Sequence, residues 1–488
     1  MERGPTMNKA KFLFAFLLVA SVAAQAAEIK KVIVRQQWPW SSDIKVEYVL
    51  SGVTVPVDIG VTVLKDGAEV ELPANSVRGD LYGVAQSQVG TITIDAAKVF
   101  GADKVKTDDL KVQLSLSDSK DDINEALYKI FDLASGACED VTRKDLLNGR
   151  WGTIETSFAA LGPGFKTGLQ DVLVWTGVTN NPIYKTDKLV MRKVHAAGVT
   201  WQSGDPPNYP YNNHASLSPQ HWIKLTYDYY IAVFELTQAQ YKKVRGSLYG
   251  TNCEFTDVEN ADWRPVNYTF RYNIHGHPKP ETADARGVVS GEPIQFPTNS
   301  YVRDVGGGTF CSRLWTKTGW EFNLPTGAEW EFACRAGSDG VLYTGEAHNE
   351  ANITKIAWAY WNAPDGIPQV VGQKAPNAFG LYDMLGNVLE HSNYAGEMNQ
   401  GAVSGTGDSE DDPAINPVGK TDTKTSSTSA TGTTYWSLGG APCDAAKYFG
   451  YWYDGRISAR YDSYEWYTSR NFLGTRLVCP VEKQWAQH

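Results

Sequence analysis

Apolar and polar residues alternate through much of the segment 28–117. Successive side chains of a β-strand point to opposite faces, so this alternation predicts strands with one buried and one exposed face. Turn-forming residues such as Lys65-Asp66-Gly67 separate the alternating stretches. Short strands at this spacing are typical of a β-sandwich, and we predict one over residues 28–117. The clearest strands are expected at 29–35, 43–49, 91–94 and 111–116.

The pattern changes after residue 117. Apolar residues between 121 and 134 recur at intervals of three and four, which is the spacing of one face of an α-helix. We therefore predict a helical and irregular connector over 118–170, with strands resuming at Val172. The residues that form the helical stripe are Ile123, Leu127, Ile130, Phe131 and Ala134.

Short strands followed by capped helices are predicted from residue 171 to residue 482. Thr237 ends one apolar stretch and is followed three residues later by Gln240. Thr326 and Glu329 repeat this spacing. A Thr at the N-cap and a Gln or Glu at the third position form a capping box, so a helix should begin at each site. These patterns indicate an α+β domain.

Residues 401–434 are rich in Gly, Ser, Thr and Asp. Such a composition leaves little apolar surface to bury, so we predict a flexible loop. Because the flanking sequences have the patterns of folded structure, the loop is interpreted as an insertion within the domain.

Residues 1–26 have the pattern of an export signal. Lys9 and Lys11 precede an apolar stretch at 12–20, and Ala24-Gln25-Ala26 matches a cleavage site. No other apolar run of 18 residues occurs, so we expect an exported protein with no transmembrane segment after signal removal. The net charge of -10 argues against nucleic-acid partners and against anionic membranes.

Cysteine and aromatic contents add two candidates for chemistry. The six cysteines can form disulfides in an exported protein. The sequence contains no C-x-x-C motif, so a zinc site or a thioredoxin-type redox site is not expected. The 16 Trp and 25 Tyr residues must either fill a loop-rich core or line a binding surface, and both interpretations stay open.

The last three-fifths of the chain contain, in order, the segments Leu324-Pro325-Thr326-Gly327-Ala328-Glu329-Trp330-Glu331, Phe379-Gly380-Leu381-Tyr382-Asp383-Met384-Leu385-Gly386-Asn387-Val388 and Gly474-Thr475-Arg476. Together these segments resemble the sulfatase-modifying factor (formylglycine-generating enzyme) family. This resemblance implies a C-type-lectin-like fold with little regular secondary structure, preceded here by the β-sandwich. The segments that begin at Leu324 and at Phe379 are the specific ones when they occur in this order.

Catalytic members of the family oxidise a cysteine of a sulfatase, using copper held by two cysteines five residues apart. The resemblance aligns that pair with Cys443 and Tyr448. Copper(I) favours two soft thiolates, and one thiolate with one phenol does not provide them. We therefore expect no copper here, and Cys443 is the one candidate for a catalytic residue.

The resemblance also implies calcium sites and one disulfide. Asn387, Val388 and Glu390 match a calcium-binding turn of the family, and Asn352 and Ile353 match part of a second calcium site. The alternative is that Asn387 and Glu390 satisfy buried backbone groups in a turn. The disulfide expected from the family pattern joins Cys311 to Cys479.

A ligand-binding face is expected in the C-terminal third of the chain. The matched arginines there either bind a ligand or have a structural role, and aromatic residues crowd the same region. The candidate ligand-binding residues are Trp436, Tyr448, Arg460 and Arg476.

Three functions follow from these observations. The first is an exported, non-copper family member that binds a peptide, protein or glycan outside the cytoplasm. The second is an oxidase of the formylglycine-generating type. The third is a structural or assembly component of the cell surface, which docks through the sandwich and self-associates.

Overall fold

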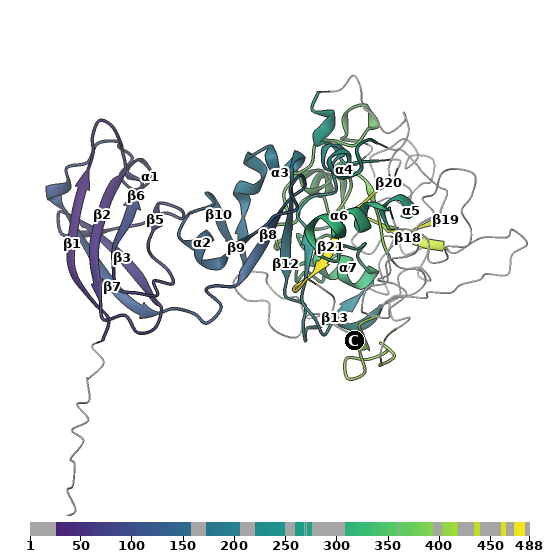
Figure 1. Cartoon of the computed structure of the whole chain (residues 1–488), viewed down its shortest axis with the longest axis horizontal. Coiled ribbons are helices and arrows are strands. Elements are labelled where there is room, and N and C mark those ends of the chain that lie inside the picture. Colours follow the sequence, from purple (N-terminus) through teal and green to yellow (C-terminus); the bar gives the residue numbers. More distant parts are fainter. Residues whose placement is uncertain are drawn as a thin grey trace, which may run out of the picture. The chain divides into compact units, whose positions relative to one another are not determined.

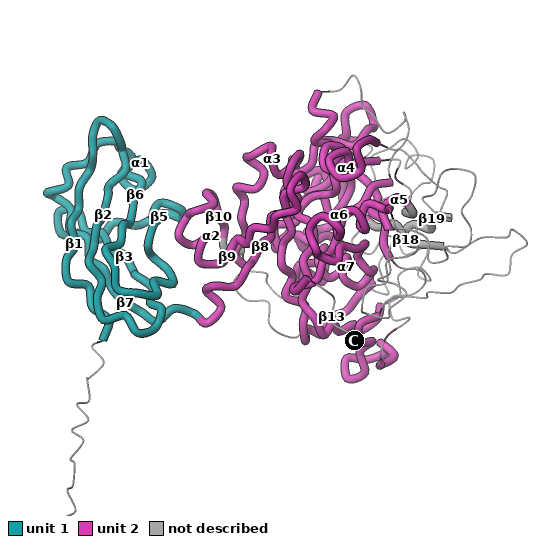
Figure 2. The backbone as a smooth tube through the Cα atoms, in the orientation of Figure 1, with its two compact units in different colours: residues 1–120 teal, residues 121–488 magenta. Residues whose placement is uncertain are grey.

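The computed structural model describes most of the chain, which forms two compact units, residues 1–120 and residues 121–488 (Figure 1, Figure 2). The described residues include no helix long and apolar enough to cross a membrane. The residues that the structure describes are 26–157, 172–204, 220–248, 259–267, 269, 271–275, 308–359, 361–393, 402, 404–417, 434–439, 460–464 and 473–483.

Unit 1 consists of two antiparallel sheets (Figure 1). One sheet has the order β1-β2-β6-β5 and the other has the order β4-β3-β7. The strands predicted at 29–35, 43–49, 91–94 and 111–116 are confirmed in β1, β2, β6 and β7, with β2 beginning at Ile44. The elements of unit 1 are β1 (Glu28–Gln36), β2 (Ile44–Ser51), β3 (Val57–Lys65), β4 (Ala68–Val70), β5 (Val77–Gly79), β6 (Gln88–Ile94), α1 (Ala96–Phe100), η1 (Thr107–Asp109) and β7 (Leu110–Asp118).

One apolar cluster joins the two sheets of unit 1. Every second residue of β2 is buried, as the alternation of the sequence requires. Residues of β3 from the other sheet bury their side chains in the same cluster. The two sheets therefore share a core. Its most buried members include Ile44, Val46, Tyr48, Leu50, Ile59, Val63, Ile92 and Ile94.

Unit 2 is built around a five-stranded sheet with the order β21-β15-β12-β8-β9, in which all pairs are antiparallel. Apolar clusters that contain residues from its strands make the core of the unit. The five strands are β8 (Ala126–Asp132), β9 (Cys138–Thr142), β12 (Lys188–Val194), β15 (Tyr229–Ala232) and β21 (Val478–Pro480).

Short helices and smaller sheets complete unit 2. The capping boxes predicted at Thr237 and Thr326 are confirmed, at the starts of α4 and α7. The other described elements are α2 (Arg143–Leu147), β10 (Ile154–Ser157), β11 (Val172–Trp175), η2 (Thr176–Asn180), α3 (Ile183–Thr186), β13 (Thr200–Ser203), β14 (His221–Lys224), α4 (Gln238–Arg245), η4 (Ala261–Trp263), α5 (Arg271–Ile274), α6 (Phe310–Thr318), α7 (Gly327–Arg335), α8 (Glu350–Ile356), η5 (Pro364–Gly366), β16 (Leu389–His391), β17 (Ala414–Ile415), β18 (Thr434–Leu438), β19 (Arg460–Tyr464) and β20 (Leu473–Gly474).

The helix predicted near the start of the 118–170 connector is wrong. Residues 126–132 form β8, an inner strand of the sheet of unit 2, and β8 is buried on both faces. A strand of this kind has an almost continuous apolar sequence, so apolar residues fall at helical spacing by coincidence. Lys129 is accommodated because its ammonium contacts Asp140 Oδ1 at 2.6 Å and lies over the Trp320 ring.

Part of the segment predicted to be a flexible inserted loop is packed against other residues of unit 2. Ala414 is fully buried, and β17 pairs in parallel with β14. The Asn416 backbone N–H donates to Lys224 O at 3.0 Å, and its side-chain oxygen accepts from the Thr226 N–H at 2.8 Å. Residues 404–417 are therefore anchored, whereas residues 418–433 lie outside the described part of the chain.

The position of Phe131 in β8 can be tested by truncation. Phe131 is fully buried, and its ring packs edge-on against Trp320 and Phe322. Phe131→Ala should lower the free energy of unfolding of unit 2 by about 3–5 kcal/mol in urea denaturation, because it leaves a cavity. Phe131→Leu should lose clearly less. A loss below about 0.5 kcal/mol for the alanine variant would fit an exposed connector and contradict the fold.

Candidate functional site

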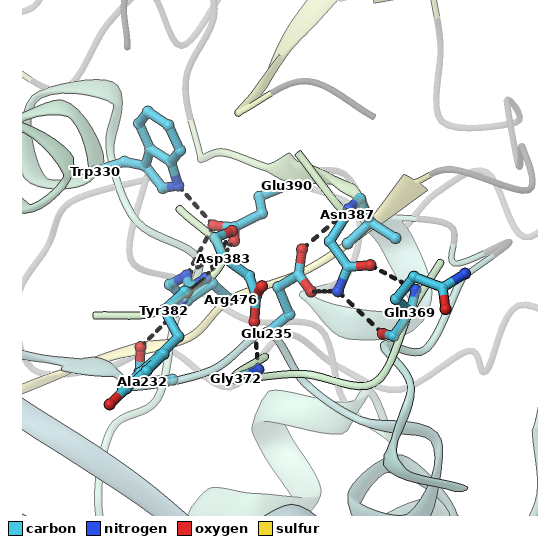
Figure 3. A network of polar contacts seen from close by, with 11 residues as sticks. Ala232, Glu235, Trp330, Gln369, Gly372, Tyr382, Asp383, Asn387, Glu390 and Arg476 are labelled. Atoms are coloured by element: carbon cyan, nitrogen blue, oxygen red, sulfur yellow. Dashed lines mark hydrogen bonds and ion pairs between the residues drawn. The ribbon is translucent and has the colours of Figure 1, made fainter. Parts of the chain in front are cut away.

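Four ionisable side chains meet in the interior of unit 2 (Figure 3). They are three carboxyls, from Glu235, Asp383 and Glu390, and one guanidinium, from Arg476. None is more than 1% exposed. A buried charge is costly unless it is paired and hydrogen-bonded, so the contacts of these groups determine what this part of the molecule can do.

Short elements bring these residues together. Glu235 follows β15, Glu390 lies in β16, and Arg476 lies between β20 and β21. Parallel pairing of β16 with β20 places Glu390 opposite Gly474, two residues before Arg476. Asp383 lies in the turn-rich segment before β16 and has a positive φ of 53°.

Every nitrogen of the Arg476 guanidinium donates inside the core. Nε donates to Glu390 Oε1 at 2.8 Å, and Nη2 is also 2.8 Å from that oxygen. Nη1 donates to the Ala232 carbonyl at 2.9 Å, and Nη2 donates to the Tyr382 carbonyl at 2.8 Å. Glu390 Oε2 also accepts from the Trp330 indole N–H at 2.6 Å. Arg476 thus ties β15, the turn before β16 and β16 itself to one another.

Glu235 and Asn387 form the second half of the network (Figure 3). Asn387 Nδ2 donates to Glu235 Oε2 at 2.7 Å, and the Val388 N–H donates to Glu235 Oε1 at 3.0 Å. The Asn387 side-chain oxygen accepts from the Gln369 N–H at 2.7 Å. Glu235 therefore holds the turn that leads into β16.

Burial, together with the excess of carboxyls over cations in the network, shifts the pKa values of the three carboxyls. Burial raises the pKa of Asp383 to about 6, although the Gly372 N–H and Arg476 oppose the rise. Burial, followed by the charges of Asp383 and Glu390, raises the pKa of Glu235 well above its ordinary value. The Arg476 charge only partly offsets the effect of burial on Glu390, whose pKa is also raised.

A comparison with protein families places this network in a known domain. Residues 190–478, more than half of the chain, match the FGE-sulfatase family, described as a sulfatase-modifying factor enzyme 1-like domain. The four ionisable residues of the network all lie within this range. The chain belongs to the FGE-sulfatase family.

Individual proteins resemble parts of the chain. Chaperone protein LppX of Paenibacillus barcinonensis is 30% identical over 187 residues, which are 33% of this chain and 61% of that protein. Among solved structures, Treponema denticola variable protein 1 has a TM-score of 0.40 at 23% identity, covering 60% of this chain and 95% of its own. PvdO from Pseudomonas aeruginosa has a TM-score of 0.40 at 18% identity, covering 60% and 94%.

The residues predicted for calcium have protein partners in this FGE-sulfatase domain. The Asn387 and Glu390 side-chain oxygens accept the hydrogen bonds described above, and the Val388 side chain is buried. Asn352 contacts Ala347 and Lys355 on an exposed turn of α8, and Ile353 is in the core. Within the described ranges, no group of three or more His, Cys, Asp or Glu residues could hold a metal ion. Calcium binding stays a prediction.

The structure describes some of the candidate ligand-binding and catalytic residues and not others. Trp436 lies in β18 and Arg460 begins β19, and these strands pair with each other. Cys443 and Tyr448 lie outside the described residues. The ligand-binding role predicted for Arg476 does not fit the structure, because its side chain is fully buried and its donors are used in the core.

The disulfide predicted between Cys311 and Cys479 is absent from the structure. Both side chains are fully buried and belong to the same apolar cluster. Burial raises the pKa of the Cys479 thiol well above its ordinary value, so this sulfur is a core group in the thiol form.

Sequence reasoning missed Glu235 and Asp383 as members of the site. Glu235 follows Tyr229-Tyr230-Ile231-Ala232-Val233-Phe234, a wholly apolar and aromatic run. A carboxylate in such a run is rarely left unpaired, so its position was an available signal for a buried polar network. Asp383 gave a weaker signal, because an Asp in a turn is common at exposed positions.

The titration of Asp383 predicts how stability depends on pH. Its pKa rises from 3.8 to about 6 on folding, so its contribution to stability is complete below about pH 4 and is lost as the pH rises through 6. At 1.36 kcal/mol per pKa unit, the effect is about 2–3 kcal/mol. Asp383→Asn removes this titration while the other carboxyls remain.

Urea denaturation of the wild type and of Asp383→Asn between pH 4 and pH 8 measures the effect. The stability of the wild type relative to the variant should fall across this range. Asp411→Asn, which changes an exposed carboxyl, should follow the wild-type profile. Parallel profiles for wild type and Asp383→Asn would show that Asp383 does not retain its proton in the folded protein.

Proposed function

We propose that this FGE-sulfatase family protein is exported and binds a polypeptide ligand without using copper. The binding face is the one around β18 and β19, which carry Trp436 and Arg460. The export signal at 1–26 supports a location outside the cytoplasm. Family membership alone does not decide the activity, because one fold can carry several functions.

The state of the cysteines is the observation that carries the non-copper proposal. Copper(I) binds thiolates, and copper oxidation of a substrate needs an accessible pair of them. Cys311, Cys334 and Cys479 are fully buried, and burial raises the pKa of Cys334 and Cys479 well above the usual range. Cys138 is exposed on β9, yet desolvation raises its pKa to about 11. These positions do not supply a partner thiolate for Cys443.

The way β18 is held supports a binding face at this end of the domain. β18 pairs with β16, so that Leu438 lies opposite Glu390 of the buried network, and Arg460 of β19 lies opposite Leu438. The Gly439 carbonyl, just after β18, accepts from the Gly386 N–H at 2.6 Å. The start of the segment that leads to Cys443 is thus fixed to the core, as a rigid binding platform requires.

The choice of a polypeptide ligand draws support from a relative. The protein that is 30% identical over 187 residues is named a chaperone, and the chain spans 61% of its length. Two alternatives remain. An oxidase of the formylglycine-generating type would need a second thiolate at Cys443. A surface assembly component would dock through unit 1, whose two-sheet arrangement suits a sandwich module.

Anaerobic copper(I) titration tests the non-copper part of the proposal. The mature wild-type protein should show no tight stoichiometric binding, and Cys443→Ser should behave in the same way. Cys253→Ser is the matched control, because Cys253 is the other cysteine outside the described residues. Tight 1:1 binding by the wild type that is lost in Cys443→Ser would overturn the proposal and support the oxidase, and its retention in Cys253→Ser would show that the loss is specific to Cys443.

The polypeptide part is tested on the same preparation with reduced, carboxymethylated α-lactalbumin as a permanently unfolded probe. Saturable binding is expected, and it should weaken at least tenfold in Trp436→Ala and stay unchanged in Trp315→Ala, a partly buried indole on α6. Absence of binding, or equal binding by both variants, would refute a polypeptide site at β18. Self-association of the protein without probe binding would favour the assembly component.

A further inference from the structure

The exposed apolar side chains of the described residues are concentrated in unit 1. Two of them are indoles in the loop between β1 and β2: Trp40 is 88% exposed and Trp38 is 42% exposed. Indoles are usually buried at least in part, because their large apolar surface is costly to leave in water. The five large hydrophobic residues that are exposed in the described ranges are Val32, Trp38, Trp40, Val55 and Val89.

The loop that carries the two indoles is held in place by hydrogen bonds of the Gln36 side chain, at the end of β1. The Gln36 side-chain nitrogen donates to the Ser42 carbonyl at 2.5 Å and to the Asp103 carbonyl at 2.7 Å. The Gln36 side-chain oxygen accepts from the Val105 N–H at 2.9 Å. Within the loop, the Ser41 N–H donates to the Gln37 carbonyl at 3.0 Å. The indoles are therefore exposed on an ordered support, which lowers the entropic cost of binding a ligand.

The apolar area that Trp38 and Trp40 expose argues for a small ligand. A complete Trp side chain buries about 150–250 Å² on contact, so two partly exposed indoles offer a few hundred Å² at most. A stable protein interface buries about 800 Å² on each partner. No further exposed large apolar residue of the described chain belongs to this loop. The loop is thus too small to be the core of a stable protein interface, but one flat indole matches the face of one sugar ring.

The charges around the loop argue for a neutral ligand. Asp43, the last residue of the loop, is paired with Arg78 at 2.5 Å. Glu47 contacts both Arg35, before the loop, and Lys45, after the loop. The three cations Arg35, Lys45 and Arg78 face the two acids Glu47 and Asp43, so the net charge beside the loop is small and a charged polymer or an anionic membrane gains little attraction here. The remaining polar side chains in the loop, those of Gln37, Ser41 and Ser42, are uncharged and can exchange hydrogen bonds with hydroxyl groups.

We propose that Trp38 and Trp40 form a binding site for a neutral glycan chain, whose sugar rings stack on the two indoles. The apolar C–H face of a pyranose ring contacts the flat indole, and the hydroxyl groups at the ring edge stay available to water and to loop side chains. This site lies in unit 1 and is independent of the polypeptide face proposed for unit 2. It gives the protein a means of attachment to a polysaccharide surface.

Isothermal titration of the mature full-length protein with chitohexaose and cellohexaose tests the site, with pull-down on insoluble chitin and cellulose as a second readout. The wild type should bind at least one of these neutral glycans. Trp40→Ala should weaken that binding at least tenfold, and Trp38→Ala should weaken it to a smaller extent. Trp40→Phe, which keeps an aromatic face, should retain binding within about threefold of the wild type, since a stacking ring is preserved.

Val89→Ala is the matched control, because Val89 is a 72% exposed apolar residue of the same unit outside the loop. It should leave glycan binding unchanged, and circular dichroism should show that all variants are folded. Failure of the wild type to bind any of these glycans would overturn the proposal, and so would equal binding by Trp40→Ala. Phosphatidylglycerol vesicles serve as the competing probe. Tryptophan-dependent vesicle binding without glycan binding would make the loop a membrane contact and contradict our assignment.

Discussion

The interaction on which unit 2 depends is the buried contact of the Arg476 guanidinium with the Glu390 carboxylate. Both groups are removed from water, so their remaining hydrogen-bonding positions must be filled by the surrounding chain. The carbonyls of Ala232 and Tyr382 and the indole of Trp330 fill them. Removing one partner of such a pair typically costs about 3–5 kcal/mol, because the other charge is left buried and uncompensated. Segments with little regular secondary structure are thereby fixed in one arrangement.

This constraint separates the features that identify the family from the features that decide activity. Asp383 and Arg476 lie in two of the segments that resemble the family, and both residues belong to the buried network. A chain can therefore keep these motifs, and with them the fold, while the cysteine pair of the catalytic members is replaced. The proposal of a non-copper binding protein rests on this separation and on the family resemblance, which places Cys443 and Tyr448 where catalytic members have two cysteines.

Local patterns in the sequence predicted much of the structure, and long-range contacts account for what they missed. The strands of unit 1 and the capping boxes at Thr237 and Thr326 depend on neighbours a few residues away, and they were predicted correctly. Strand β8 was missed because both of its faces are buried by residues distant in sequence, which removes the alternation. The role of Arg476 was left open for a similar reason: only the fold shows that Glu390, 86 residues earlier, occupies its donors.

Native-state hydrogen exchange gives the most direct test of the claim that the buried network fixes this part of unit 2. The amides of Val388 and Gly372 donate to the carboxyls of Glu235 and Asp383. Our account predicts that these amides exchange only through global unfolding of unit 2, with the same free energy as the amide of Met191 in the inner strand β12. Exchange of Val388 and Gly372 through a local opening, with a much smaller free energy than that of Met191, would contradict it.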